Sequence, residues 1–274
     1  MSFGNGYVLG QSERGARRLA IQDAHFAGAS EALLDELELR PTDRVVEFGC
    51  GPGTFSRRVM RRLGPGGALV GVDSSEGLLA HARAALAGIG PAQFIPVLAD
   101  VSQLGEWLHG ADVVVGRAVL HHIPMAELVL GRLRSLLRSG ARVGFIEPDF
   151  RSPLGRLAFL EATGRSDVAP LRIWGTTINQ LYLAKRLSPD VGASLASTLG
   201  TAGYCNVRSA WAECSSDPLM VENMLMFYDE VRDLLQSLGI LTAEELARQQ
   251  LLLRTLSPNG LPAAWGIHRV VAAT

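Results

Sequence analysis

The sequence Val45-Val46-Glu47-Phe48-Gly49-Cys50-Gly51-Pro52-Gly53-Thr54 joins an apolar strand to a turn that carries a glycine at every second position. Glycine lets the backbone take conformations closed to other residues and lets a ligand lie against the main chain. A turn of this kind after a strand is typical of nucleotide-cofactor binding. The dinucleotide fingerprint would need a third glycine where this chain has Thr54. The stretch therefore predicts an adenosine ligand other than NAD.

Outward from this turn, apolar strand-like runs alternate with amphipathic helical segments, which is the pattern of βαβ units in a parallel α/β sheet. The predicted strands are residues 44–48, 68–72, 93–98, 111–116, 142–147, 206–213 and 264–272. Thr54 is predicted to cap a helix over residues 55–63. The alternation breaks at residues 150–187 and 218–260, which read as helical insertions. We expect these insertions to form a lid for the substrate within a single domain of residues 1–274.

Composition excludes several partners. The chain is 47% hydrophobic and 19% charged with a net charge of −1, so no basic field exists to hold nucleic acid or an anionic membrane. No run approaches the roughly 20 apolar residues that span a bilayer, which makes the cytoplasm the expected location. Three scattered cysteines predict neither a disulfide framework nor a metal site. Lys185 is the single lysine beside many arginines, a bias associated with high-G+C bacteria.

Three acidic residues lie near the carboxyl ends of successive predicted strands, where ligands of open α/β sheets bind. They are Glu47, Asp73 and Asp100. An acid at the second strand can accept hydrogen bonds from both hydroxyls of a ribose, and one at the third from an adenine amine. Each could instead cap a helix or begin a turn. Together with the glycine turn, they favour a bound adenosine.

At these residues the chain resembles the class I S-adenosylmethionine-dependent methyltransferases, whose first motif is an acid followed by Gly-x-Gly-x-Gly after the first strand. The resemblance covers residues 40–150 most strongly and 190–274 in layout. It implies a Rossmann-like, mostly parallel seven-stranded sheet with helices on both faces, in which the last strand is antiparallel and inserted between the fifth and sixth. It also implies S-adenosylmethionine as the cofactor. The cofactor contacts that follow are Gly49, Gly51 and Gly53 for the methionine and ribose, Asp73 with Ser74 for the ribose hydroxyls, Asp100 with Val101 for the adenine, and Glu47 of the first motif.

The run from Arg117 to Pro124 resembles the segment that lines the methyl-transfer cleft in this family. A histidine there could remove a proton from a hydroxyl or amine, because its pKa lies near operating pH. Related small-molecule methyltransferases place a substrate-facing histidine just before an apolar residue, so His122 is the predicted base. His121 is the alternative and a predicted substrate contact. The pair could also be structural, and Arg117 could reach the cofactor carboxylate or form a structural salt bridge.

Three further residues are candidates for the site. Tyr7 lies in a segment that resembles an amino-terminal motif of bacterial family members, which implies a helical cover over residues 1–40 and a contact with the cofactor carboxylate. Glu147, just past the fifth predicted strand, would face the substrate, although a proline-stiffened strand exit also explains it. Tyr182 could line a substrate pocket, although aromatic residues at helical spacing are more often core.

The resemblance implies transfer of a methyl group to O, N or C of a small molecule, with a secondary metabolite as the expected acceptor. The apolar content of the helical insertions suits an apolar or aromatic acceptor and equally a homodimer interface. The alternative function is an S-adenosylmethionine-binding enzyme that catalyses a cyclisation or rearrangement without methylating.

Overall fold

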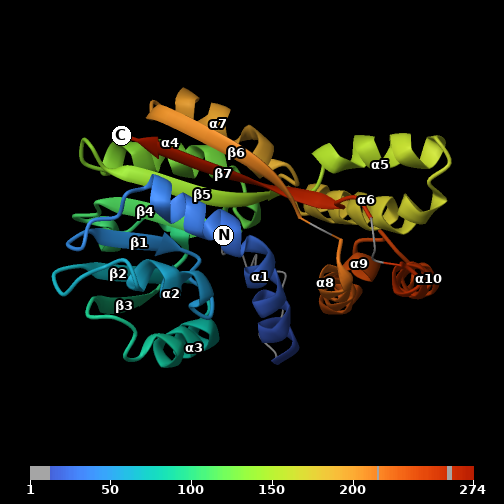
Figure 1. The fold of residues 1–274 in the computed structure, drawn as a ribbon, viewed down its shortest axis with the longest axis horizontal. Helices are drawn as coiled ribbons and strands as arrows, with labels where there is room; N and C mark the ends of the chain where they lie inside the picture. The colour runs from blue at the N-terminus through green and yellow to red at the C-terminus, as the bar shows by residue number, and fades with distance from the viewer. Residues whose placement is uncertain (1–12, 215, 258–260) are drawn as a thin grey trace. The chain divides into compact units, whose positions relative to one another are not determined.

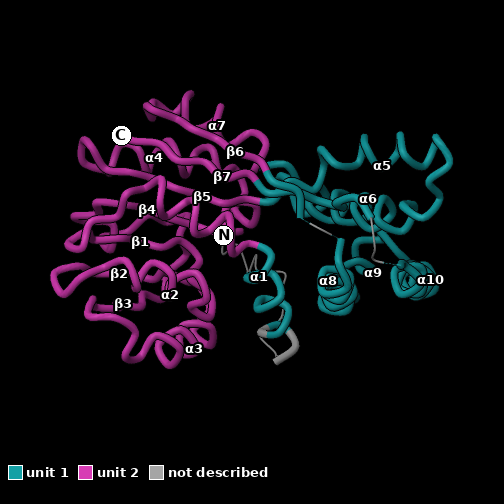
Figure 2. The backbone as a smooth tube through the Cα atoms, viewed as in Figure 1, with its two compact units in different colours: residues 1–25, 148–191, 212–267 teal, residues 26–147, 192–211, 268–274 magenta. Residues whose placement is uncertain are grey.

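In the computed structural model, residues 13–214, 216–257 and 261–274 are described, and the chain forms two compact units (Figure 2). Unit 1 comprises residues 1–25, 148–191 and 212–267, and unit 2 comprises residues 26–147, 192–211 and 268–274. The prediction of one domain with helical insertions stays a prediction.

The strands form one seven-stranded sheet in the order β3-β2-β1-β4-β5-β7-β6 (Figure 1). The strands are β1 (Arg44–Phe48), β2 (Ala68–Asp73), β3 (Gln93–Leu98), β4 (Val113–Arg117), β5 (Arg142–Asp149), β6 (Cys205–Cys214) and β7 (Trp265–Ala273). Strands β1 to β5 pair in parallel, and the antiparallel β7 lies between β5 and β6, as predicted. Several predicted strand ends differ from the structure by one or two residues. In particular, β5 continues to Asp149, so the run from Glu147 to Asp149 lies within this strand and not past its end.

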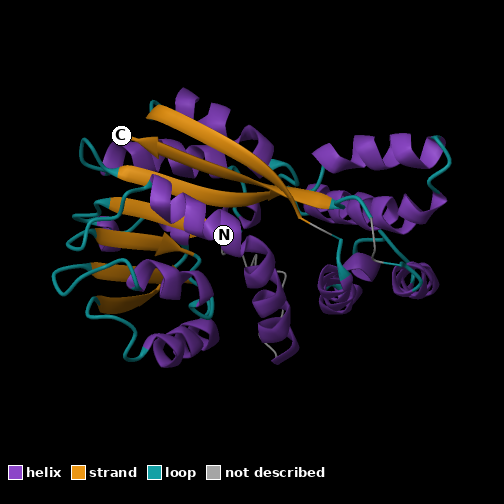
Figure 3. Cartoon of the chain, viewed as in Figure 1, coloured by secondary structure: helices purple, strands orange, loops and turns teal. Residues whose placement is uncertain are grey.

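The central strands are mainly apolar because helices cover the sheet. Val45 and Val46 of β1 and the run Val113–Val115 of β4 are fully buried. Figure 3 shows the flanking helices of unit 2, α2 (Thr54–Met60), α3 (Glu76–Leu86), α4 (Ala126–Leu136) and α7 (Val191–Thr201). The carboxyl-terminal part of α1 (Glu13–Glu36) packs on β5, since a Cβ at Gly144 would lie 3.2 Å from a methyl of Leu33.

The start of α2 differs from the prediction. Gly53 is the N-cap residue, with φ at 88°, and no side chain caps the helix. The Thr54 hydroxyl accepts a hydrogen bond from Arg117 at 2.8 Å and is not the cap. The helix ends at Met60 and not at Leu63, because the next residues turn toward the glycine-rich loop before β2.

Unit 1 is helical. It contains α5 (Ser152–Ala162), α6 (Ala169–Ala184), α8 (Pro218–Glu230), α9 (Arg232–Ser237) and α10 (Ala243–Arg254). A short 3-10 turn at Ser166–Val168 also belongs to unit 1, and the 3-10 turns of unit 2 are Val101–Gln103, Glu106–Leu108 and Leu120–His122. The described parts of residues 150–187 and 218–260 are therefore mainly helical, as predicted, while their role as a lid stays a prediction. Across the described ranges, no helix is both long and apolar enough to pass through a membrane.

Candidate functional site

The turn between β1 and α2 holds its backbone in the left-handed region at all three glycines, with φ of +63° at Gly49, +53° at Gly51 and +88° at Gly53. A Cβ on Gly49 would lie 2.7 Å from Cγ2 of Val119, so glycine lets the turn approach the segment after β4. A Cβ on Gly51 would meet no described atom within 4 Å. The turn therefore leaves room for a ligand against the main chain at Gly51.

Asp73 ties the end of β2 to this turn. Its Oδ2 accepts a hydrogen bond from the Gly51 amide at 2.9 Å, and its Oδ1 accepts one from the Ser75 amide at 2.9 Å. Burial raises the pKa of the Asp73 carboxyl, and backbone hydrogen bonds oppose this shift. A carboxylate has about four acceptor positions, so Asp73 keeps capacity for the hydroxyls of a ribose. Ser74 is exposed beside it, and Ser75 caps α3.

Glu47 lies inside β1 and its side chain turns toward α2. The residue is 1% exposed, and its Oε2 accepts a hydrogen bond from the Ser56 hydroxyl at 2.7 Å. Burial raises the pKa of Glu47 to about 8, against the lowering effects of this hydrogen bond and of the Arg117 charge. Glu47 thus connects the strand to the helix that follows the turn, while its contact with a cofactor stays a prediction.

Asp100 follows β3 by two positions and is exposed. Its Oδ1 accepts a hydrogen bond from the Ser102 amide at 2.9 Å, which makes it the cap of the short turn Val101–Gln103. The side chain of Val101 is buried next to it. Asp100 can cap this turn through Oδ1 and still accept a hydrogen bond from a ligand, since its second carboxylate oxygen is also an acceptor.

Arg117, at the end of β4, holds two helices together within unit 2. Its guanidinium donates to the Ser30 hydroxyl at 3.2 Å and to the Thr54 hydroxyl at 2.8 Å. The same group lies over the ring of Phe26, 5.8 Å from its centroid, and over that of Phe55, at 5.2 Å. These contacts fix Arg117 between α1 and α2, and its predicted contact with the cofactor carboxylate stays a prediction.

Glu147 lies beneath the segment after β4 and holds it in place. It is fully buried, and its Oε1 accepts from the backbone amides of Val119 at 2.9 Å and Leu120 at 2.8 Å. Its Oε2 accepts from the His121 amide at 3.3 Å and lies 2.8 Å from Nδ1 of His121. Burial raises the pKa of Glu147 to about 7, although three backbone hydrogen bonds favour its ionised form. Glu147 therefore supports the segment, and its predicted contact with the substrate stays a prediction.

The two histidines have different surroundings. His121 is 4% exposed and paired with Glu147, whereas His122 is half-buried. Their ring centroids are 4.0 Å apart at an interplanar angle of 41°. A carboxylate on one ring nitrogen fixes the tautomer of that histidine. The structure thus makes His121 the anchored member and His122 the more accessible one.

Tyr182 lies in unit 1, where it is 5% exposed and packs 5.6 Å from the ring of Phe150. Tyr7 lies outside the described residues. The remaining predicted site residues all belong to unit 2 and come from the carboxyl ends of β1 to β5 or the turns after them. Sequence reasoning did not find Ser56, and it gave Val119 no role of its own within the run from Arg117 to Pro124. A buried acid within a strand needs a nearby donor, and this rule could have drawn attention to the hydroxyl of Ser56.

The arrangement fits an adenosine cofactor. The turn is open at Gly51, and Asp73 offers remaining acceptor positions two strand-ends away from the segment that carries His122. Within the described ranges, no cluster of three or more histidine, cysteine, aspartate or glutamate side chains is arranged to hold a metal ion.

Comparison with known proteins agrees with this geometry. The family model for a methyltransferase domain matches residues 46–143. An uncharacterized methyltransferase of Mycobacterium bovis is 33% identical over 151 residues, which cover 50% of this chain and 68% of that protein. Aklanonic acid methyltransferase from Streptomyces sp. is 26% identical over 208 residues, covering 74% of this chain and 93% of that protein. The chain spans about half the length of other curated relatives it matches, 46% and 49% for two trans-aconitate 2-methyltransferases.

Solved structures share the fold. A cyclopropane synthase from Mycobacterium tuberculosis superposes with a TM-score of 0.58 at 14% identity, covering 90% of this chain and 84% of that one. The [4+2]-cyclase SpnF superposes with a TM-score of 0.54 at 16% identity, covering 92% and 81%. The glycine turn, the acid at the end of β2 and the matched relatives agree, and the chain belongs to the class I S-adenosylmethionine-dependent methyltransferases.

Proposed function

We propose that this protein transfers a methyl group from S-adenosylmethionine to O, N or C of a small-molecule acceptor. One observation carries the proposal: the turn of this methyltransferase chain is open at Gly51 and tied by that same residue to Asp73. When bound, S-adenosylmethionine supplies an electrophilic methyl group on a positively charged sulfur. The protein's part is to hold and orient the reactants and to exclude water, because alignment alone can be worth roughly 7–11 kcal/mol.

The proposed cofactor contacts follow the geometry of unit 2. The glycine turn would hold the methionine and ribose, Asp73 with Ser74 the ribose hydroxyls, and Asp100 with Val101 the adenine. The acceptor positions that remain on the two oxygens of Asp73 after its bonds to Gly51 and Ser75 support its assignment.

His122 is proposed to take a proton where the acceptor must lose one, as a hydroxyl does. His122 is half-buried whereas His121 is buried, and the hydrogen bonds of Glu147 hold the segment that carries both. His121 and Glu147 would then position His122. An amine that arrives neutral needs no strong base, so the importance of His122 depends on the acceptor atom.

The acceptor is proposed to be an apolar or aromatic small molecule, such as a secondary metabolite, bound through the helices of unit 1. The relative named as an aklanonic acid methyltransferase supports this class, since the match covers 93% of that protein. The apolar helices of unit 1 equally suit a homodimer interface, and sedimentation of the purified protein would distinguish the two.

The test is a measurement of S-adenosylhomocysteine. Binding of S-adenosylmethionine is first measured by calorimetry, and the protein is then incubated with panels of aromatic and apolar acceptors. Formation of S-adenosylhomocysteine in step with a methylated product supports the proposal. The fold shared with a [4+2]-cyclase favours one alternative, a reaction without methyl transfer. Conversion of an acceptor in the presence of the cofactor, without S-adenosylhomocysteine, would establish that alternative.

A further inference from the structure

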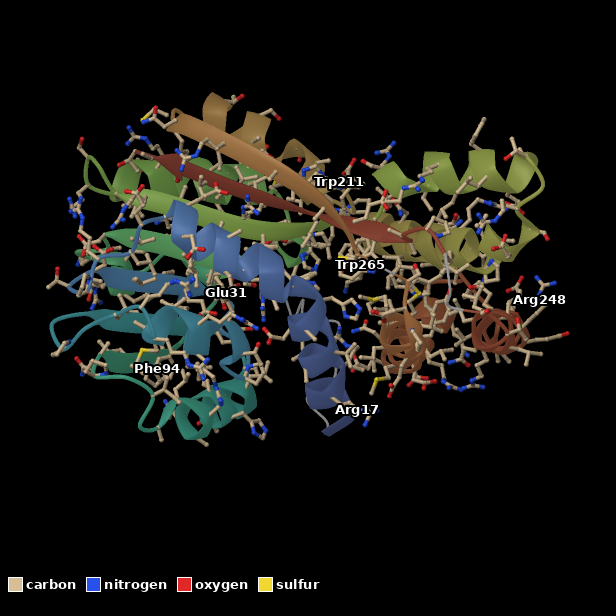
Figure 4. The ribbon with its side chains drawn as sticks, viewed as in Figure 1. Arg17, Glu31, Phe94, Trp211, Arg248 and Trp265 are labelled. Carbon is tan, nitrogen blue, oxygen red and sulfur yellow. The ribbon has the colours of Figure 1, made fainter. Side chains whose placement is uncertain are left out.

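Five aromatic rings pack together in the interior of unit 1. They come from the residue after β5, from α6, from α8 and from the start of β7, where Figure 4 labels Trp265. The rings are Phe150, Trp174, Tyr182, Phe227 and Trp265, each less than 10% exposed. Phe150 lies at the centre, with ring centroids 5.6 Å from Tyr182, 5.4 Å from Trp265 and 6.1 Å from Trp174. Trp174 also lies 6.2 Å from Phe227.

Trp174 carries a buried donor that meets no acceptor among the described residues. Trp174 is 4% exposed, and its indole Nε1 has no hydrogen-bond acceptor within the described part of the chain. Other buried polar side chains of α6 are satisfied: the Thr177 hydroxyl donates to the Ile173 carbonyl at 3.1 Å, and the Asn179 amide donates to the Phe150 carbonyl at 2.7 Å. A buried indole N–H usually finds an acceptor, because leaving it unsatisfied is costly. The indole N–H of Trp174 is therefore available to an acceptor from outside these residues.

The surroundings of Trp174 favour an organic molecule over a water. A buried water needs two to four polar partners, whereas the rings that contact the indole are the hydrocarbon rings of Phe150 and Phe227. An oxygen atom attached to an apolar ring satisfies the N–H and leaves the rest of the molecule in contact with carbon. An aromatic ring can also pair with the rings of the cluster in stacked or edge-to-face contacts.

We infer that unit 1 recognises the acceptor molecule through Trp174, whose indole N–H donates to a carbonyl oxygen borne on a planar aromatic ring. The inference rests on the proposed function, since it names the class of acceptor for that reaction. It makes Trp174 a specificity-determining residue: aromatic ketones bind better than hydrocarbons of the same size. Tyr182, predicted to line the substrate pocket, belongs to the same cluster through Phe150.

The test compares two probes that differ in one oxygen, 2-acetylnaphthalene and 2-ethylnaphthalene. The full chain contains four tryptophans, and their indole N–H signals can be resolved in a nitrogen-15 spectrum and assigned by phenylalanine substitutions. We expect 2-acetylnaphthalene to move the Trp174 signal downfield and 2-ethylnaphthalene to leave it in place. Trp174→Phe should weaken the ketone about 10-fold, which corresponds to one hydrogen bond, and leave the hydrocarbon unchanged.

Trp211→Phe is the matched control, because Trp211 is 47% exposed on β6 and outside the cluster. It should change neither affinity. The inference would be overturned if 2-acetylnaphthalene bound to wild type and to Trp174→Phe with the same affinity. It would also be overturned if the Trp174 signal did not respond to 2-acetylnaphthalene. If Trp174→Phe fails to fold, the wild-type spectrum decides, since the other three signals can be assigned through their own variants.

The outcome is separable from that of the proposed function. A protein that forms S-adenosylhomocysteine with an acceptor but shows no response at Trp174 overturns this inference alone. A response at Trp174 without S-adenosylhomocysteine from any acceptor overturns the proposed function alone.

Discussion

Replacing Gly51 with alanine separates cofactor binding from folding. Gly51 has φ of +53°, and an added Cβ meets no described atom within 4 Å, so Gly51→Ala introduces left-handed strain without a clash. An L-residue in this region costs about 1–2 kcal/mol. For a domain of this size we expect Tm to fall by roughly 2–8 °C. The added methyl would occupy the space assigned to the cofactor, so we expect the affinity for S-adenosylmethionine to fall by an order of magnitude or more.

Gly88→Ala is the matched control. Gly88 follows α3, has φ of +73°, and likewise has no neighbour within 4 Å of a built Cβ among the atoms described. Its alanine variant carries the same backbone strain at a position without a proposed ligand. Scanning calorimetry should give similar losses of Tm for the two variants, and titration calorimetry should show weakened cofactor binding for Gly51→Ala alone. Equal affinities in the two variants would refute the assignment of the turn to the cofactor.

The remaining predictions concern carboxylates and histidines. Asp73→Asn leaves one acceptor oxygen where two are in use, so we expect stability to fall by about 1–3 kcal/mol and the cofactor to bind more weakly, measured by melting and calorimetry. Burial raises the pKa of Glu47 from 4.5 to about 8, so the folded chain keeps a proton that the unfolded chain releases, and stability falls as pH rises across that window. Glu47→Gln should reduce this dependence of the unfolding free energy on pH, which is at most about 1.4 kcal/mol per pH unit and is measured by urea unfolding. An unchanged slope of unfolding free energy against pH would contradict the raised pKa of Glu47. His122→Ala should lower turnover while leaving cofactor affinity and Tm near wild type, and unchanged turnover would reject His122 as the base. His121→Ala should instead lower stability by about 1–3 kcal/mol, because Glu147 loses a buried partner.

The sheet was predictable because its signals are local. The run Val113–Val115 is fully buried, and such apolar runs between turns indicate parallel strands that helices cover. The turn with Gly49, Gly51 and Gly53 was predictable for the same reason, since positive φ at alternate positions demands glycine.

The orientation of the polar side chains was not predictable, because it depends on partners distant in sequence. Arg117 donates to Ser30, 87 positions away, and Glu147 accepts from the amides of Val119 and Leu120, 28 and 27 positions away. No local pattern states that these residues meet. The sequence therefore indicated that Glu147 is important and predicted a contact with the substrate, which stays a prediction, but it did not indicate the segment that Glu147 supports.

The central claim is that this chain methylates a small molecule with S-adenosylmethionine. It is tested most directly by incubating the protein with methyl-carbon-13 S-adenosylmethionine and an aromatic ketone acceptor. Mass spectrometry then follows both the acceptor and S-adenosylhomocysteine. The account predicts that labelled methyl appears on the acceptor in equal amount to S-adenosylhomocysteine. An acceptor that is converted without label and without S-adenosylhomocysteine would contradict it.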